Sequence, residues 1–316
     1  MTIIPVSLVI PVRNEAETLT ELFEALVALS AKPAEIIFVD TGSTDSSLLL
    51  LEKWAILESS ERTCCQVLNL SGGYPGAARN RGVVAATQDW IVFLDSGIVP
   101  SPDWLIKLWE SQVAEGSDAV FGVCSFVSDT SLGRMICALS SGYRKVLPVL
   151  PASLFRRSLF DKVGFFEEGL RSGEDLLWKK MLVDARVPMS VCNSACVEYR
   201  HFPSSLKQAF QKWFIYEQSA TIAGVKSKAR TVVLLLVLAM YALILFLPHL
   251  GLALFSSYLL ARGFLDPLRR SNWTVWWTKW WQIIGMLPLA ALLDFAAALG
   301  RVTALLGLSS FRLRAG

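Results

Sequence analysis

Two aspartates directly follow apolar segments that predict buried strands. The run WIVFL at residues 90–94 is continuously apolar and leads into Asp95, Gly97 and two prolines, which cannot continue a strand. Residues 35–39 form a similar run that ends at Asp40. Open α/β sheets bind ligands beyond the carboxyl ends of their strands. We therefore expect both carboxylates at one edge of the sheet. One would accept hydrogen bonds from the ribose and base of a nucleotide, and the other would bind a diphosphate–metal group.

Each acidic group also has a purely structural interpretation. Asp95 could cap the helix that begins near Pro102, but Ser101 is the better N-cap, which favours a ligand-binding role for Asp95. Glu174 and Asp175 begin a predicted helix, and the helix dipole stabilises carboxylates in a first turn. This pair is therefore either a cap or the source of a general base, which must lie within hydrogen-bonding reach of the proton that it removes.

Strands and helices alternate through the first two thirds of the chain. Apolar runs predict strands at residues 6–10, 35–39, 66–70, 90–94, 118–123 and 152–155. Capping signals and amphipathic spacing predict helices between most of them, for example after Asn14 and after Thr44 or Asp45. This order requires crossover helices, and therefore predicts an α/β fold with a mainly parallel sheet flanked by helices.

The last third of the chain is strongly apolar. Residues 231–261 contain no Asp, Glu, Lys or Arg, a length that is too long for one upright membrane span and short for two. Pro248 and Gly251 divide this run, so it is either a long kinked helix or a re-entrant hairpin. Five tryptophans at residues 271–281 resemble an interfacial belt, and a second apolar segment at 282–300 carries Asp294, which we expect to pair with Arg301 or to pack against the first segment.

These features predict two parts, a globular domain at residues 1–228 and a membrane domain at 229–316, the alternative being a hydrophobic core domain in place of the membrane part. The chain has 316 residues, 53% of them hydrophobic, and a net charge of +3. The globular part has no Lys/Arg-rich run, so no nucleic-acid partner is expected.

We expect a reduced, cytosolic domain for two reasons. The six cysteines do not have the spacing of a zinc site, and the N-terminus does not resemble a signal peptide.

Five motifs now carry a resemblance to a known family. In order they are IPVRNEAETL, FVDTGSTDSS, GAARNRG, FLDSGIVPSPDWL and SGEDLLWKKM. Together they resemble the family-2 glycosyltransferases over about residues 4–220, which implies the GT-A fold, related to the Rossmann fold, and an inverting transfer from a nucleotide sugar.

The resemblance also implies roles for individual residues. The catalytic pair is Glu174 and Asp175, with Asp175 as the base and Glu174 orienting it or the acceptor. Expected contacts to the nucleotide sugar come from Pro11, Arg13, Glu15, Asp40, Ser43, Arg79 and Asp95. The later segment around Gln211 and Trp213 lacks the arginine usual in processive synthases, which argues against processive synthesis.

The metal-binding motif departs from the family pattern of Asp-X-Asp. Here it is Asp95-Ser96-Gly97, so the second carboxylate is missing. A hard cation such as Mg²⁺ or Mn²⁺ can still bind through one carboxylate, diphosphate oxygens and water. His201 lies where many relatives place a histidine near the metal, and it is either a second metal ligand or a partly buried polar residue.

The sequence therefore predicts a membrane-anchored inverting glycosyltransferase that faces the cytoplasm of the cell membrane. Its partners would be a nucleotide-sugar donor and a hydroxyl of a lipid or lipid-linked glycan. One alternative is a polyprenyl-phosphate glycosyl transferase, although a phosphate acceptor is already ionised and needs no base. The other is a non-catalytic sugar-nucleotide-binding membrane protein, which the incomplete Asp-Ser-Gly motif would suit.

Overall fold

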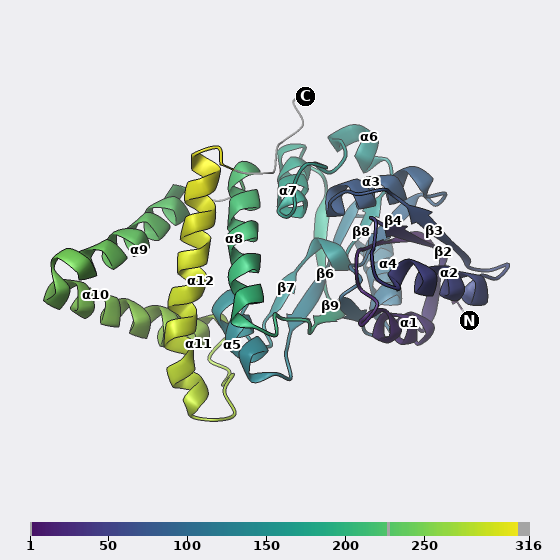
Figure 1. Ribbon diagram of the computed structural model, residues 1–316. Coiled ribbons are helices and arrows are strands. Elements are labelled where there is room, and N and C mark those ends of the chain that lie inside the picture. Colours follow the sequence, from purple (N-terminus) through teal and green to yellow (C-terminus); the bar gives the residue numbers. More distant parts are fainter. Residues whose placement is uncertain (1, 226–227, 309–316) are drawn as a thin grey trace.

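A computed structural model describes residues 2–225 and 228–308. A curled mixed sheet lies at one end, and a group of long helices covers one side of it (Figure 1). A helical hairpin projects from these helices on the side away from the sheet.

The first half of the sheet has the expected parallel pairing. Its order is β3-β2-β1-β4, and each of its contacts is parallel. The strands are β1 (Thr2–Val12), β2 (Ala31–Asp40), β3 (Cys64–Asn69) and β4 (Trp90–Phe93). The connecting helices are α1 (Leu19–Val27), α2 (Ser47–Glu58) and α3 (Pro75–Ala85). Residues 8–10 and 91–93 are fully buried, because helices cover both faces of a parallel sheet.

Beyond β4 the pairing is mixed. The order continues β4-β8-β6-β9-β5, with β8 antiparallel to both β4 and β6 and with β6 parallel to β9. The elements are β5 (Ile98–Pro100), α4 (Trp104–Glu115), β6 (Ala119–Phe126), α5 (Ser131–Ser140), β7 (Val146–Pro148), η1 (Leu150–Ala152), β8 (Leu154–Arg156), α6 (Leu159–Val163), α7 (Glu174–Asp184) and β9 (Met189–Tyr199). The parallel expectation thus holds for the half that the alternating pattern covered most clearly.

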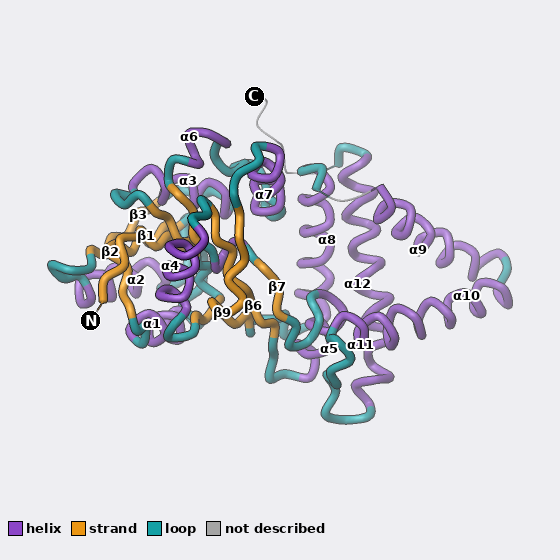
Figure 2. Tube along the Cα trace, turned by 180° about the vertical axis from the view of Figure 1, so that it is seen from behind, coloured by secondary structure: helices purple, strands orange, loops and turns teal. Residues whose placement is uncertain are grey.

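Every element of secondary structure described in the C-terminal third is a helix. It comprises α8 (Leu206–Ile222), α9 (Lys228–Phe246), α10 (Pro248–Leu260), a π-helical segment η2 (Ala261–Leu265), α11 (Asp266–Arg270) and α12 (Trp281–Leu305). In both views α8 and α12 lie side by side, and the α9–α10 hairpin lies beyond α12 (Figures 1 and 2).

Helix α12 packs against α5 and α8 along most of its length. Met286, Leu289 and Leu293 join α5 in one buried cluster. Further along, Gly300 lies so close to α8 that an added Cβ would be 2.2 Å from the carbonyl oxygen of Phe214. The buried Arg301 pairs with Glu217 of α8 at 2.6 Å. Helix α12 is therefore largely a packed helix of this fold.

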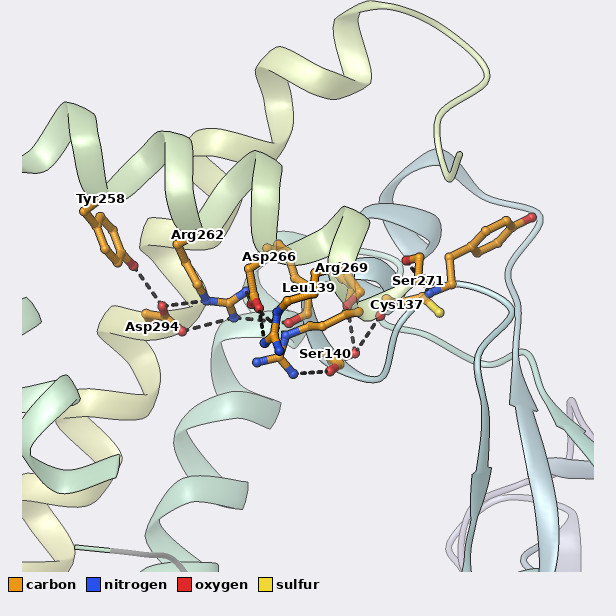
Figure 3. Close-up of polar contacts among 12 residues, drawn as sticks. Cys137, Leu139, Ser140, Tyr258, Arg262, Asp266, Arg269, Ser271 and Asp294 are labelled. Carbon is orange, nitrogen blue, oxygen red and sulfur yellow. Dashed lines mark hydrogen bonds and ion pairs between the residues drawn. The ribbon is translucent and has the colours of Figure 1, made fainter. Parts of the chain in front are cut away.

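A cluster of polar contacts joins α10 and η2, at the base of the α9–α10 hairpin, to α5 and α12 (Figure 3). Asp294 accepts hydrogen bonds from Tyr258 Oη and Arg262 Nε, each at 2.9 Å. Arg262 also donates to the carbonyl oxygen of Leu139 at 3.1 Å. The expected pairing of Asp294 with Arg301 is wrong, because Arg301 binds Glu217 instead, while the expected packing of Asp294 against the hairpin is confirmed.

Among the described residues one helix, α12, is long and apolar enough to cross a membrane, with a mean hydropathy of 2.0 over its most apolar window. Of that window 56% is buried inside the protein. The segment Thr231–Phe246 is apolar but shorter.

Candidate active site

A cavity of about 530 Å³ opens at the carboxyl ends of the parallel strands. Pro11 lines it from the end of β1, Arg13 and Glu15 from the loop after β1, and Asp95 from the loop after β4. A volume of this size suits a small-molecule ligand. Four of the residues expected to contact a nucleotide sugar are thus brought together in one cavity.

Arg79 connects this cavity to the acidic pair. Its Nη2 donates to Asp95 Oδ1 at 2.8 Å, and its Nη1 donates to Glu174 Oε1 at 2.6 Å. Its side chain is only 3% exposed. Burial by itself lowers the pKa of this guanidinium, but Asp95 and Glu174 more than compensate, so Arg79 stays charged. The fold therefore fixes one cation between two carboxylates.

The sequence around Arg79 explains its position. Gly76 lies against the Glu167 carbonyl, where an added Cβ would be 2.4 Å from the oxygen. Asn80 holds the backbone of Phe166 from both sides, accepting from its N–H and donating to its carbonyl, each at 2.9 Å. These contacts fix α3 against the segment that leads to α7, so Arg79 reaches the acidic pair.

Glu174 and Asp175 have different environments although they are neighbours. Glu174 is 4% exposed, and burial raises its pKa against the opposing effect of Arg79. Its Oε2 is buried and, among the described residues, has no hydrogen-bond partner. Asp175 is half-buried and lines a second cavity of about 300 Å³. Asp175 is thus the member of the pair that meets solvent, and Glu174 is the buried one.

The two cavities adjoin. Pro75, Asp95, Arg171 and Tyr216 line both of them. A donor in the first cavity and an acceptor in the second would meet beside Asp95 and Arg171. This arrangement suits a direct group transfer between two bound molecules.

Asp40 and Ser43 hold the loop beside the cavity rather than lining the cavity itself. Asp40 is 1% exposed and accepts from the N–H groups of Gly42 and Ser43, each at 3.0 Å, and from the Ser43 hydroxyl. Gly42 has a φ of +82°, which only glycine adopts readily. The loop's own donors thus occupy both Asp40 oxygens, and its predicted contact to base or ribose stays a prediction.

Both predicted metal ligands line the first cavity. His201 and Asp95 both do so, and the His201 ring lies 3.8 Å from where a Cβ on Gly97 would be. Among the described residues no group of three or more His, Cys, Asp or Glu gathers to hold a metal ion. These two side chains could therefore hold only a cation that is also bound by the diphosphate. Mg²⁺ is often bound in this way, by a few protein ligands together with phosphate oxygens.

Helix α8 contributes a cationic and aromatic wall to the cavity, which no sequence motif predicted. Lys212 Nζ donates to Tyr199 Oη at 2.8 Å, and lies 5.4 Å from the ring centroid of Tyr216. Desolvation, followed by the nearby Arg171, lowers the pKa of Lys212 to about 8. The i, i+4 spacing of Lys212 and Tyr216 was the available signal, since it places both on one helical face.

Comparisons with known proteins agree with this geometry. The sequence profile described as "Glycosyl transferase family 2" matches residues 7–166. Glycosyltransferase AglE of Haloferax volcanii is 27% identical over 65% of this chain and 71% of its own length. Pre-mycofactocin glycosyltransferase of Mycobacterium tuberculosis is 30% identical over 58% of this chain and 40% of its own. The chain thus spans less than half of the latter relative's length.

Solved structures show the same fold. Mannosyltransferase PcManGT from Pyrobaculum calidifontis, in complex with GDP-Man and Mn²⁺, gives a TM-score of 0.60 at 15% identity, over 96% of this chain and 88% of that one. S. aureus TarS 1–349 in complex with UDP-GlcNAc gives 0.51 at 16% identity, over 96% and 92%. At these identities the similarity shows the fold.

Proposed function

Because this chain belongs to glycosyl transferase family 2 and is a glycosyltransferase, we propose that it transfers a sugar with inversion from a nucleoside diphosphate to a hydroxyl of a lipid or lipid-linked acceptor. The observation that carries the proposal is the Arg79 bridge, which joins Asp95 in the donor cavity to Glu174 beside the acceptor cavity. Family membership sets aside the alternative of a non-catalytic binding protein.

The donor cavity has the charges that a sugar nucleotide needs. Arg13, Arg171 and Lys212 line it, and each can bind a diphosphate oxygen. Asp95 and His201 are the proposed protein ligands of a divalent cation, which when bound would neutralise charge on the departing diphosphate. PcManGT is described with Mn²⁺, which supports a metal in this cavity. Arg79 donates a hydrogen bond to Asp95 and so fixes the direction of that carboxylate.

The acceptor cavity contains the proposed base. Asp175 is half-buried there, so its carboxylate can take the proton of an acceptor hydroxyl while remaining within reach of water. Glu174 is held by Arg79 and acts as a positioning residue at the start of α7. The nucleophile would attack the anomeric carbon from the side opposite the diphosphate, and this single displacement inverts the centre.

A phosphate acceptor is the second candidate. Undecaprenyl-phosphate 4-deoxy-4-formamido-L-arabinose transferase of Pseudomonas fluorescens is 36% identical over 41% of this chain and 38% of its own length. Arg171 lines both cavities and could bind such a phosphate. A phosphate acceptor needs no base, so that reaction would not use Asp175, which is why we favour the hydroxyl acceptor.

We also propose that the protein is located at the cell membrane, with its catalytic part facing the cytoplasm.

The test is turnover by the purified full chain. Labelled nucleotide sugars, including UDP-GlcNAc and GDP-mannose, would be supplied with lipid extracts, and the lipid phase would be analysed for a product stable or labile to mild acid. Release of the transferred sugar alone by mild acid indicates a phosphodiester and identifies the phosphate acceptor. A glycosidic bond that survives mild acid, on the intact lipid or on a released glycan, supports the hydroxyl acceptor. Absence of transfer from every donor, with intact nucleotide binding, would contradict the proposed activity.

A further inference from the structure

We propose that the α9–α10 hairpin enters one leaflet of an anionic lipid bilayer and returns to the same face, while α12 remains outside the hydrocarbon. This inference rests on the proposed function, since it names the surface that would bring the active site to a lipid-borne acceptor. It concerns membrane contact alone and can be tested without any sugar donor.

The hairpin carries an apolar surface that the described residues leave uncovered. Its tip is the most exposed part: Leu245 is 80% exposed, Phe246 79% and Leu247 54%. Further exposed apolar side chains follow on both arms: Val232, Val233, Leu235, Leu236, Leu250, Leu252, Leu254 and Leu260. Soluble monomeric proteins rarely expose so many apolar side chains in one region of their surface. The hairpin also projects away from the sheet (Figures 1 and 2), so an external apolar phase can surround it.

Neither arm of the hairpin is as long as the roughly 30 Å hydrocarbon core is thick, so arms that enter one leaflet lie tilted in it. Helices α9 and α10 have 19 and 13 residues, which at about 1.5 Å per residue gives ~28 Å and ~20 Å. Only Thr231–Phe246 of α9 is free of charge, which is shorter than the roughly 20 residues that a span needs. Gly251 brings the arms into contact beside the turn, since an added Cβ would lie 2.7 Å from the Ile244 backbone. The run is therefore a hairpin and not one kinked spanning helix.

Helix α12 cannot be the spanning element without submerging the active site. It lies side by side with α8, with Gly300 against the Phe214 carbonyl and Thr303 accepting from Gln218 at 2.8 Å. The same α8 places Lys212 in the donor cavity, which must exchange a charged nucleotide with water. If α12 crossed the bilayer, α8 and that cavity would lie at the depth of the hydrocarbon, where charged groups are costly.

The base of the hairpin has the chemistry of an interface with anionic lipid. Trp273 and Trp280 are 68% and 73% exposed, and tryptophan is enriched at the level of lipid headgroups. The side chain of Arg269 is 70% exposed, and Lys228 is also exposed. Basic residues near a bilayer surface gain favourable energy from anionic lipids. Charge and aromatic residues thus flank an uncharged insertion, which fits a bilayer better than a protein groove.

The first test measures binding to vesicles. The full chain would be floated with vesicles of phosphatidylcholine alone or mixed with phosphatidylglycerol. The tip variant carries Leu245→Gln, Phe246→Gln and Leu247→Gln. The control variant carries Ile56→Gln, Leu57→Gln and Val113→Gln, residues of α2 and α4 that are similarly exposed, at 78%, 79% and 66%. We expect at least a tenfold loss of flotation for the tip variant and none for the control, with nucleotide affinity unchanged in both.

The second test measures topology. A protease-sensitive reporter would be appended after Gly316 in the chain reconstituted into sealed vesicles, and only vesicles with an outward-facing active site would be scored. Monotopic insertion leaves the reporter on the same side as the active site, where it is digested. A protected reporter would show that α12 crosses the bilayer and would overturn the proposal.

Two further outcomes would also overturn it. One is flotation of the tip variant equal to that of the wild type. The other is a lipid-free dimer that the tip substitutions dissociate, together with no flotation of the wild type, which would assign the hairpin to self-association. Failure of sugar transfer with normal flotation would contradict the proposed function and leave the membrane contact intact.

Discussion

Arg79 Nη1 lies 2.6 Å from Glu174 Oε1, and both side chains are almost completely buried. A buried ion pair is weak evidence for stability, because desolvation offsets much of the attraction. Its position suggests a different purpose. The pair fixes the start of α7, and hence Asp175, relative to Asp95 in the donor cavity.

Replacing Arg79 with Met should cost about 3–5 kcal/mol of stability, the usual effect of leaving a buried charge unpaired. Without Arg79 the pKa of Glu174 rises further above its unfolded value. The loss should therefore be small below the unfolded pKa of a glutamate and should grow as pH rises through the folded one. Urea unfolding at mildly acidic and mildly alkaline pH measures this. Adding Glu174→Gln should restore part of the stability but not the activity, and equal losses at both pH values would contradict the assignment.

Asp175→Asn should lower the turnover number about 10²–10⁴-fold, the typical contribution of a general base. Nucleotide affinity should be unchanged, because the residues of the donor cavity are untouched. Asp184→Asn on the same helix is the matched control, since Asp184 is exposed and forms an ion pair with Lys180 one turn away. Turnover would be measured with saturating donor and a hydroxyl acceptor. Near-normal turnover of Asp175→Asn with this acceptor would exclude Asp175 as the base.

Nucleoside diphosphate affinity should depend on the charge of Lys212. Its pKa is lowered to about 8, so the free protein loses this positive charge as pH rises past that value. Affinity should therefore fall between neutral and mildly alkaline pH. Lys212→Met should be weaker at neutral pH and should lack this fall, whereas Lys212→Arg should keep high affinity throughout. Titration calorimetry would measure it, and a wild-type pH profile retained by Lys212→Met would exclude the residue.

Asp95→Asn should abolish transfer and weaken the effect of added Mn²⁺ or Mg²⁺ on nucleotide binding. The reason is that Asp95 is the single carboxylate of its motif. Nucleotide affinity would be titrated with and without the metal, so the result does not depend on turnover. Full wild-type activity in a chelator would contradict the metal assignment without affecting the fold.

Gly300→Ala should destabilise the chain by about 1–3 kcal/mol, because the new Cβ would meet the Phe214 carbonyl and force α12 away from α8. Gly285→Ala is the control on the same helix, since its Cβ would lie at an ordinary 3.6 Å from Met135 Sδ. Thermal unfolding of both variants in detergent measures the difference. Equal melting temperatures would show that the two helices separate easily.

The parts of the site that are local in sequence could be predicted well. Pro11, Arg13 and Asp95 lie at or just beyond the ends of strands, and such positions converge wherever parallel strands end. Lys212 was missed because a helix far along the chain brings it to the cavity, and no local pattern marks that approach. Asp40 was placed correctly at the end of a strand, but sequence alone does not show that its own loop satisfies its oxygens.

The mixed half of the sheet and the role of α12 were harder to predict for a physical reason. Strands β5, β7 and β8 have three residues each, too few for a period to be recognised. Hydropathy shows only that α12 is apolar. Burial of that helix against α5 and α8 accounts for its apolar composition as well as burial in lipid would. The division of the chain at residue 228 stays a prediction.

The packing of α12 on α8 has a practical consequence for preparing the enzyme. Cutting the chain before α9 would uncover Ala209 and Gln218 on α8 and would leave Glu217 without Arg301. A water-soluble form is better sought by deleting the outer turns of α9 and α10 and joining the remaining arms with a short polar linker. Helix α12 would then still complete the wall that carries Lys212, and the shortened protein should crystallise without detergent while retaining its nucleotide cavity.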